Sequence, residues 1–360
     1  MLYNIEFLRF IFTIAIIIGH AVSFSKQEIA YNYIGNPGFC VELFFIIAGY
    51  FLFYDIKKQE SNLNFTTKDF AIKKFARLMP VFVFACIMQI LFYAIGLIEQ
   101  KFYFKYEFLN MLFIREIGIN SFSLVPLRND IYSTNTNVWF IGPMFWTSLL
   151  FFYMLRNFDK KKVHLTIIIL IFLSFVLYCR TSLQHPLSQL ARAISGIGIG
   201  YFLAIFCDWY KNNCNPNLTT KKNKIIFTIL ELLILLEIFN TIFKKQYSLD
   251  LNLYFMILFC VLLFSFVFNK GYIGQFLNNK FFGFMGKYCY SIYILQYIVQ
   301  ITIGKGNKLM STIWYSNFRN NYPNLDLIIS IVIIIVFGII AYYLVEQPFK
   351  KYIEKKFIQK

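Results

Sequence analysis

The chain has 360 residues, of which 58% are hydrophobic and only 15% are charged, and its net charge is +17. A soluble domain of this length has more charge and a less apolar average, so this composition excludes an ordinary water-soluble fold. The basic charge does not indicate a nucleic-acid partner, because no soluble basic domain exists to present it.

The apolar residues lie in blocks, and most blocks are long enough to cross a bilayer core of ~30 Å, which takes ~20 helical residues. Helices are expected because backbone polar groups must be satisfied inside lipid, and the alternating pattern of a membrane barrel is absent. The sequence therefore predicts an all-α fold, a polytopic membrane helix bundle of about ten transmembrane helices that forms one domain over residues 1–360. The blocks lie near residues 5–24, 39–54, 80–98, 138–155, 163–178, 190–206, 225–240, 251–268, 284–303 and 326–345, of which 39–54 and 163–178 are short for a span.

The lysines and arginines are unevenly placed between these blocks. With a cytoplasmic N-terminus, the inside loops and the basic tail at 350–360 hold 22 of them, and the outside loops hold 11. This bias fits the positive-inside rule with both termini in the cytoplasm. The first block lacks a clear small-residue cleavage site after Gly19, so we expect a membrane helix there and not a removed signal peptide.

The first block, LRFIFTIAIIIGH, carries Arg9 near its start and His20 at its end. Eleven positions are close to three helical turns, so both side chains are expected on one face, ~16 Å apart along the axis. Glu6 precedes Arg9 by three positions and can pair with it. Charges inside a span usually face a cavity and serve a function, and imidazole is the usual proton-transfer group. Alternatively, Arg9 snorkels to the headgroups and His20 lies at the outer interface.

The second block, GFCVELFFIIAGYFLFYD, places Glu42 close to the expected outer side, at a depth similar to that of His20. A carboxylate beside an imidazole orients its tautomer and raises its basicity. The alternative is a carboxylate at the start of a helix, where the helix dipole favours it. Arg192 is a further charge that falls inside a predicted span.

The stretch KDFAIKKFARLMPVF is basic and comes just before a span on the expected cytoplasmic side. Lys74 and Arg77 are three positions apart, so they share a helix face. Basic groups at this place suit a phosphate-rich cytoplasmic ligand. They can equally be ordinary positive-inside anchors.

Several familiar site patterns are missing from the sequence. The seven cysteines are scattered without a C-x-x-C spacing, and no Gly-rich phosphate loop, G-x-S-x-G or H-E-x-x-H occurs, so neither a metal nor a permanently bound cofactor is expected. No internal repeat is visible, which weighs against an inverted-repeat transporter. The loop 99–137 is the longest, is expected outside, and has a length that is uncommon unless functional.

Seven sequence elements follow one another in a recognisable order. They are Arg9-x10-His20, CVELFFIIAGYFL, KKFARLMP, NVWFIGPMFW, ARAISGIGIGYFLA, YSIYILQYIV and YYLVEQPFKK. Together they resemble the acyltransferase-3 family of bacterial integral-membrane acyltransferases, over about residues 6–351. The Arg-x10-His pair is the most specific single element.

This resemblance implies a membrane O-acyltransferase. Such a protein takes an acyl group, commonly acetyl, from cytoplasmic acyl-CoA, so acetyl-CoA is a donor substrate. It delivers the group to a hydroxyl of an envelope carbohydrate at the outer side of the bacterial inner membrane. The implied acceptors are sugars of O-antigen, capsule, lipooligosaccharide or peptidoglycan.

The resemblance also implies roles for individual residues. It makes His20 catalytic together with Arg9, maps Glu42 to the acidic residue of the second span, and links Lys74 and Arg77 to acyl-CoA binding. Lys74 departs from the arginine that the family has at that position. Lysine keeps the charge but loses the bidentate fork.

Three further positions are candidates of lower rank. Gln296 stands where many relatives carry histidine, and Trp139 is followed by FIGPMFWTS instead of a Glu-rich stretch. Glu346 matches a family carboxylate, but it can equally form a structural pair with Lys350 or Lys351. The departures suggest a different acceptor pocket or subgroup.

The expected mechanism has His20 as general base on the acceptor hydroxyl, oriented by Glu42. A covalent acyl-histidine intermediate is the competing mechanism. Two other classes of protein stay open. One is a proton-coupled transporter or flippase for a lipid-linked sugar, since buried Glu, His and Arg also suit proton relays. The other is a scaffold in a glycan-assembly complex.

Overall fold

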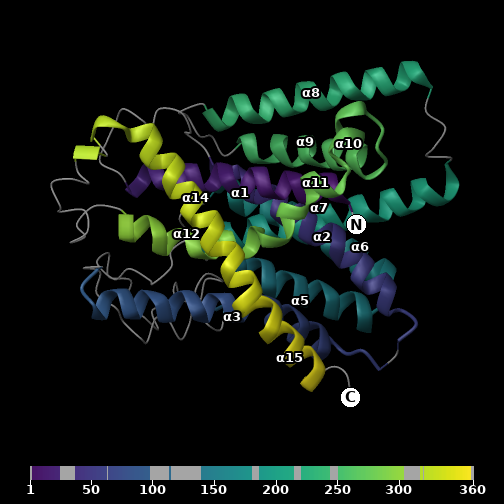
Figure 1. Ribbon diagram of the computed structural model, residues 1–360. Coiled ribbons are helices and arrows are strands. Elements are labelled where there is room, and N and C mark those ends of the chain that lie inside the picture. Colours follow the sequence, from purple (N-terminus) through teal and green to yellow (C-terminus); the bar gives the residue numbers. More distant parts are fainter. Residues whose placement is uncertain are drawn as a thin grey trace. The chain divides into compact units, whose positions relative to one another are not determined.

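The computed structural model describes residues 2–24, 37–62, 64–97, 113–114, 139–180, 186–214, 220–243, 250–303, 317–318 and 320–357 (Figure 1). All regular structure in these ranges is helical, which agrees with the predicted all-α class. Each of the ten predicted blocks coincides with a helix. The long helices are α1 (Tyr3–Phe24), α2 (Cys40–Gln59), α3 (Thr67–Ala94), α5 (Ile141–Asn157), α6 (Lys160–Arg180), α7 (Pro186–Asn213), α8 (Lys221–Phe243), α9 (Asp250–Val267), α12 (Cys289–Ile303) and α14 (Pro323–Ala341).

Within the described residues, six helical segments are long and apolar enough to cross a membrane: Tyr3–His20, Pro37–Gln59, Thr67–Ala94, Leu187–Asn213, Lys221–Phe243 and Pro323–Phe357. The two blocks that look short in the sequence belong to longer helices, because α2 has 20 residues and α6 has 21. The fold is therefore a helical membrane bundle, while the count of ten spans and the cytoplasmic termini remain predictions. The long loop 99–137 falls almost wholly outside the described residues.

The helices form two compact units. Unit 1 comprises Met1–Phe12, Gly35–Thr67 and Pro143–Lys287. Unit 2 comprises Thr13–Ile34, Lys68–Gly142 and Tyr288–Lys360. Helix α1 contributes its first half to unit 1 and its second half to unit 2. The single functional domain over residues 1–360 remains a prediction.

Close packing of α2 on α7 forms the centre of unit 1. A side chain at Gly200 would place its Cβ 2.0 Å from the carbonyl oxygen of Ile46, and one at Gly49 would lie 2.0 Å from that of Ile197. Gly196 and Gly200 are four positions apart, a spacing that lets helix backbones approach closely in membranes. The absence of side chains at these glycines therefore sets the distance between the two helices.

Buried polar side chains connect other helices of unit 1 through hydrogen bonds. Glu231 of α8 is 1% exposed, and its carboxylate accepts from Ser265 Oγ of α9 at 2.6 Å and from the backbone of Gly274 at 3.1 Å. Gly274 lies in the short helix α10 (Tyr272–Leu277), which packs against both α8 and α9 (Figure 1). Asn4 of α1 donates to two backbone carbonyls, those of Phe266 at 2.8 Å and Gly274 at 3.0 Å. The carboxylate of Glu231 and the amide nitrogen of Asn4 are thus both hydrogen-bonded, as burial requires.

Helix α12 is the buried element of unit 2. Every residue from 288 to 300 is buried. Helix α14 packs against it (Figure 1), and a Cβ at Gly338 would lie 2.5 Å from the side chain of Ile292. After α14, a π-helical turn, η6 (Tyr342–Glu346), leads into α15 (Gln347–Phe357). Such π-turns within helices often lie at functional sites.

Candidate active site

An ion pair lies at the start of α1 in unit 1. Arg9 Nη1 donates to both carboxylate oxygens of Glu6, at 2.8 and 3.0 Å. The two side chains are only 15% and 11% exposed. The predicted pairing of these residues is confirmed, and Arg9 is held by a carboxylate on its own helix.

His20 and Gln296 come close together in unit 2. The Nδ1 atom of His20, near the end of α1, is buried without a hydrogen-bond partner among the described residues. The amide of Gln296 on α12 is fully buried and lies within interaction range of the imidazole. Gln300, one turn further along α12, donates Nε2 to the carbonyl of Ile17 on α1 at 2.9 Å. Helix α12 therefore presents a polar, amide-bearing face to the turn that carries the histidine.

Glu42 forms a buried ion pair with Arg192 in unit 1. Arg192 Nε lies 2.5 Å from Glu42 Oε1, and the two side chains are 6% and 0% exposed. Arg192 also donates Nη2 to the carbonyl of Gly38 at 2.8 Å. The pair joins α2 to α7 across 150 positions of sequence. Glu42 belongs to unit 1 and His20 to unit 2, and the expected contact between them remains a prediction.

Lys74 and Arg77 lie on α3 in unit 2, on the shared face that their spacing predicts. Lys74 Nζ lies 5.1 Å from the ring centre of Phe70, and Arg77 is exposed. The hydroxyl of Tyr290 on α12 donates to the carbonyl of Leu78 on α3. This contact fixes the start of α12 next to the basic turn of α3.

Glu346 contacts α12 directly, and Trp139 is linked to that helix through Phe140. Glu346, in the π-helical turn, is 3% exposed and accepts from Ser291 Oγ at 2.5 Å. Trp139 packs edge-on against Phe140, with ring centres 6.1 Å apart, and Phe140 packs edge-on against Tyr293 at 4.9 Å. Tyr293 precedes Gln296 by three positions, so both side chains lie on the same side of α12.

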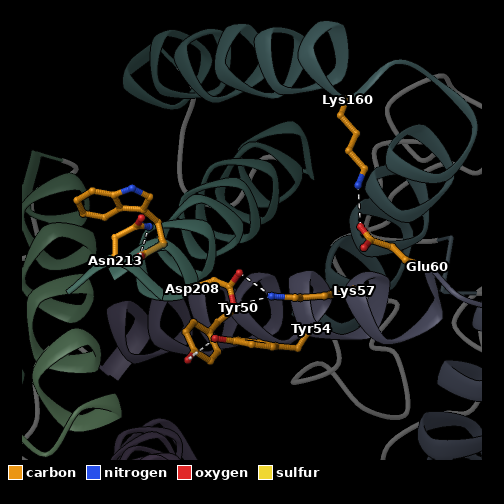
Figure 2. A network of polar contacts seen from close by, with 8 residues as sticks. Tyr50, Tyr54, Lys57, Glu60, Lys160, Asp208 and Asn213 are labelled. Atoms are coloured by element: carbon orange, nitrogen blue, oxygen red, sulfur yellow. Dashed lines mark hydrogen bonds and ion pairs between the residues drawn. The ribbon is translucent and has the colours of Figure 1, made fainter. Parts of the chain in front are cut away.

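A separate polar network lies in unit 1 at the ends of α2, α5 and α7 and the start of α6. It borders a pocket of about 340 Å³. Figure 2 shows that Lys57 points at Asp208, with Nζ 2.6 and 2.7 Å from the carboxylate oxygens, and that Lys160 points at Glu60, at 2.7 Å. His164 Nε2 lies 3.0 Å from the hydroxyl of Tyr201. These groups satisfy one another, so the pocket does not require a ligand.

Six of the ten predicted residues thus belong to unit 2 and four belong to unit 1. Unit 2 holds His20, Lys74, Arg77, Trp139, Gln296 and Glu346, and unit 1 holds Glu6, Arg9, Glu42 and Arg192. No group of three or more His, Cys, Asp and Glu that could hold a metal ion occurs in the part of the chain that the structure describes.

Sequence reasoning missed several partners of these residues. The sequence did indicate the pairing of Arg192 with Glu42, since opposite charges inside predicted spans usually form ion pairs with each other. It did not indicate the partners of Ser291, Tyr290 and Gln300, because a hydroxyl or an amide in an apolar block does not reveal which helix it meets.

These features define a multi-pass helical membrane protein whose interior holds a histidine, buried amides and buried ion pairs. The chain matches the acyltransferase-3 family model, described as an acyltransferase domain, over residues 2–346. This match covers nearly the whole chain, so the chain belongs to that family and is a membrane acyltransferase. No curated protein and no solved structure matches the chain.

Proposed function

We propose that this protein is a membrane O-acyltransferase that moves an acyl group, most simply acetyl, from cytoplasmic acyl-CoA to a hydroxyl of a bacterial envelope carbohydrate. The family match supports acyl transfer in general. The observation that carries the site is His20, which has a buried Nδ1 beside the amide of Gln296. A base buried among polar groups without protein partners is suited to meet a substrate.

His20 acts as the general base in the proposed reaction. Its unprotonated ring nitrogen takes the proton from the acceptor hydroxyl while the oxygen attacks the thioester carbonyl carbon. The C–S bond then breaks, and the imidazolium returns the proton to the leaving thiolate. The products are an ester and free CoA. In the competing form, His20 itself attacks and an acyl-histidine forms first.

The donor is bound through its phosphates. CoA is strongly anionic, and guanidinium and ammonium groups are the side chains that bind phosphate. Arg77 is exposed on α3 and Lys74 is on the same face. Arg9 is the third cation assigned to the donor, and its guanidinium is paired with Glu6 on the same helix.

The acceptor lies at the opposite side of the membrane in this proposal. The excess of basic residues in alternate loops supports cytoplasmic termini and about ten spans. His20 then lies at the outer end of α1, where a sugar of O-antigen, capsule, lipooligosaccharide or peptidoglycan can reach it. The protein is accordingly assigned to the bacterial inner membrane.

Purified protein in lipid nanodiscs, supplied with acetyl-CoA and envelope glycan, provides the test. Protein-dependent release of the free CoA thiol, with transfer of the acetyl group to the glycan, is the expected result. His20→Gln should abolish both, since an amide cannot take the proton. Movement of a lipid-linked sugar across the membrane without thioester cleavage would instead identify a transporter.

A further inference from the structure

Four buried side-chain atoms in the described part of unit 2 make no hydrogen bond of regular geometry. In the described part of this unit, the buried side-chain nitrogen and oxygen atoms without a hydrogen bond are His20 Nδ1, both amide atoms of Gln296, and Gln300 Oε1. All four belong to the turn of α1 that carries His20 or to the face of α12 that meets it. Buried polar groups in native proteins are almost always hydrogen-bonded, so these atoms indicate a polar group that enters from outside the chain.

Other buried polar groups on α12 are satisfied. Tyr290 donates to the carbonyl of Leu78, and Ser291 donates to Glu346. On α12, the atoms without hydrogen bonds are therefore confined to the turn from Gln296 to Gln300 and do not reflect poor packing of the whole helix. In that turn, Gln296 is fully buried and Gln300 is 4% exposed.

The hydrogen bond of Gln300 shows that this turn of α12 faces α1. Gln296 and Gln300 are four positions apart, so they lie on one helix face. Gln300 Nε2 donates to the carbonyl of Ile17, three residues before His20. This bond uses the amide nitrogen of Gln300 and leaves its oxygen, which is only an acceptor. Among the described residues of α12, Gln296 keeps an amide N–H without a hydrogen bond of regular geometry beside the histidine.

Acyl transfer needs such a donor. When the hydroxyl attacks the thioester, the carbonyl oxygen gains negative charge, and a preorganised N–H aimed at that oxygen stabilises it. The carbonyl carbon must lie within bonding distance of the oxygen that His20 deprotonates, so the carbonyl oxygen lies close to the imidazole as well. Gln296 lies beside the imidazole, so its amide would be within reach of that oxygen. An amide also stays neutral while the imidazole gains and loses its proton.

We propose that Gln296 is a catalytic residue that donates its Nε2–H to the thioester carbonyl oxygen. This inference rests on the proposed function. The proton of the acceptor hydroxyl goes to His20, the new C–O bond forms, and the negative charge on the former carbonyl oxygen is held by the amide. The C–S bond then breaks, the carbonyl reforms, and the thiolate takes the proton from His20.

The test compares Gln296→Leu, Gln296→Glu and Thr302→Val in nanodiscs with acetyl-CoA, at matched amounts of monodisperse protein. Leucine removes both amide atoms, and glutamate keeps the size but replaces the donor by an acceptor. Thr302 is the control, because among the described residues its hydroxyl donates to the carbonyl of Ile298 on the same helix, at 2.7 Å. Release of the CoA thiol is measured with water alone and with envelope glycan added.

Both Gln296 variants are expected to lower kcat by roughly 10²–10³-fold, the loss seen for a single oxyanion donor. KM for acetyl-CoA should stay within about threefold, because the donor acts on the transition state and not on the bound substrate. The control should turn over like the intact protein.

The results separate the inference from the proposed function. An intact protein that never consumes acetyl-CoA, with water or with any glycan, removes the proposed function and the inference with it. An active intact protein whose Gln296 variants keep a normal kcat overturns the inference alone. It is also overturned if hydrolysis in water is unchanged and only transfer to glycan falls, because Gln296 would then bind the acceptor.

Discussion

Replacement of Arg192 by methionine is expected to destabilise the protein strongly. The substitution leaves the carboxylate of Glu42, which is fully buried, without the guanidinium at 2.5 Å, and it also removes the donor to the carbonyl of Gly38. Removing one partner of a buried ion pair costs about 3–5 kcal/mol, because the other charge remains in a medium that solvates it poorly. Helices α2 and α7 should separate more easily as a result.

The protein itself contains a matched control for this prediction. Lys57 and Asp208 join the same two helices with an ion pair at 2.6 Å, but the lysine side chain is 46% exposed. Solvent screens such a pair, so Asp208→Asn should cost less than about 1 kcal/mol. The comparison of two pairs on the same helices isolates the effect of burial.

The assay is the fraction of detergent-purified protein that stays monodisperse after heating. Arg192→Met should lower the midpoint temperature by at least roughly 5 °C, and Asp208→Asn should barely change it. The double variant Glu42→Leu/Arg192→Met should recover much of the loss, because it leaves no unpaired charge. Equal midpoints for Arg192→Met and Asp208→Asn would refute the reasoning from burial.

Two further predictions concern helix packing and the donor. Gly200→Leu should prevent accumulation of folded protein in the membrane, because even its Cβ would lie 2.0 Å from the carbonyl oxygen of Ile46. Gly38→Ala is the control, since a Cβ there meets nothing within 4 Å, and normal levels of the Gly200 variant would contradict the packing described. Arg77→Ala should raise KM for acetyl-CoA by about tenfold or more, because it removes a hydrogen bond to a charged phosphate. Lys74→Arg should bind acetyl-CoA at least as well as the native lysine does. An unchanged KM for Arg77→Ala in steady-state kinetics would remove Arg77 from the donor site.

Much of the fold could be predicted from the sequence. Each of the ten long helices was predicted by an apolar block in the sequence. A bilayer imposes this pattern of apolar blocks and charged loops on any chain that crosses it. Helix ends were less predictable. The blocks at 39–54 and 163–178 look short because polar residues such as Lys57 and Lys160 belong to the same helices but end the apolar run.

The candidate site was predictable only where its partners are close in sequence. The pairing of Glu6 with Arg9 follows from a spacing of three on one helix and is confirmed. The pairing of Glu42 with Arg192 spans 150 positions, and no local pattern specifies which helix α2 meets. Gln296 was singled out by its departure from a family pattern, whereas its unpaired amide depends on how α12 packs on α1.

Mass spectrometry of envelope glycan tests the central claim most directly. Cells carrying the intact protein, His20→Ala or no protein are compared, with membrane levels of the two forms matched. The account predicts a glycan mass increased by one or more acetyl groups with the intact protein only. Normal acetylation by His20→Ala, or no protein-dependent acetylation of any glycan, would contradict it.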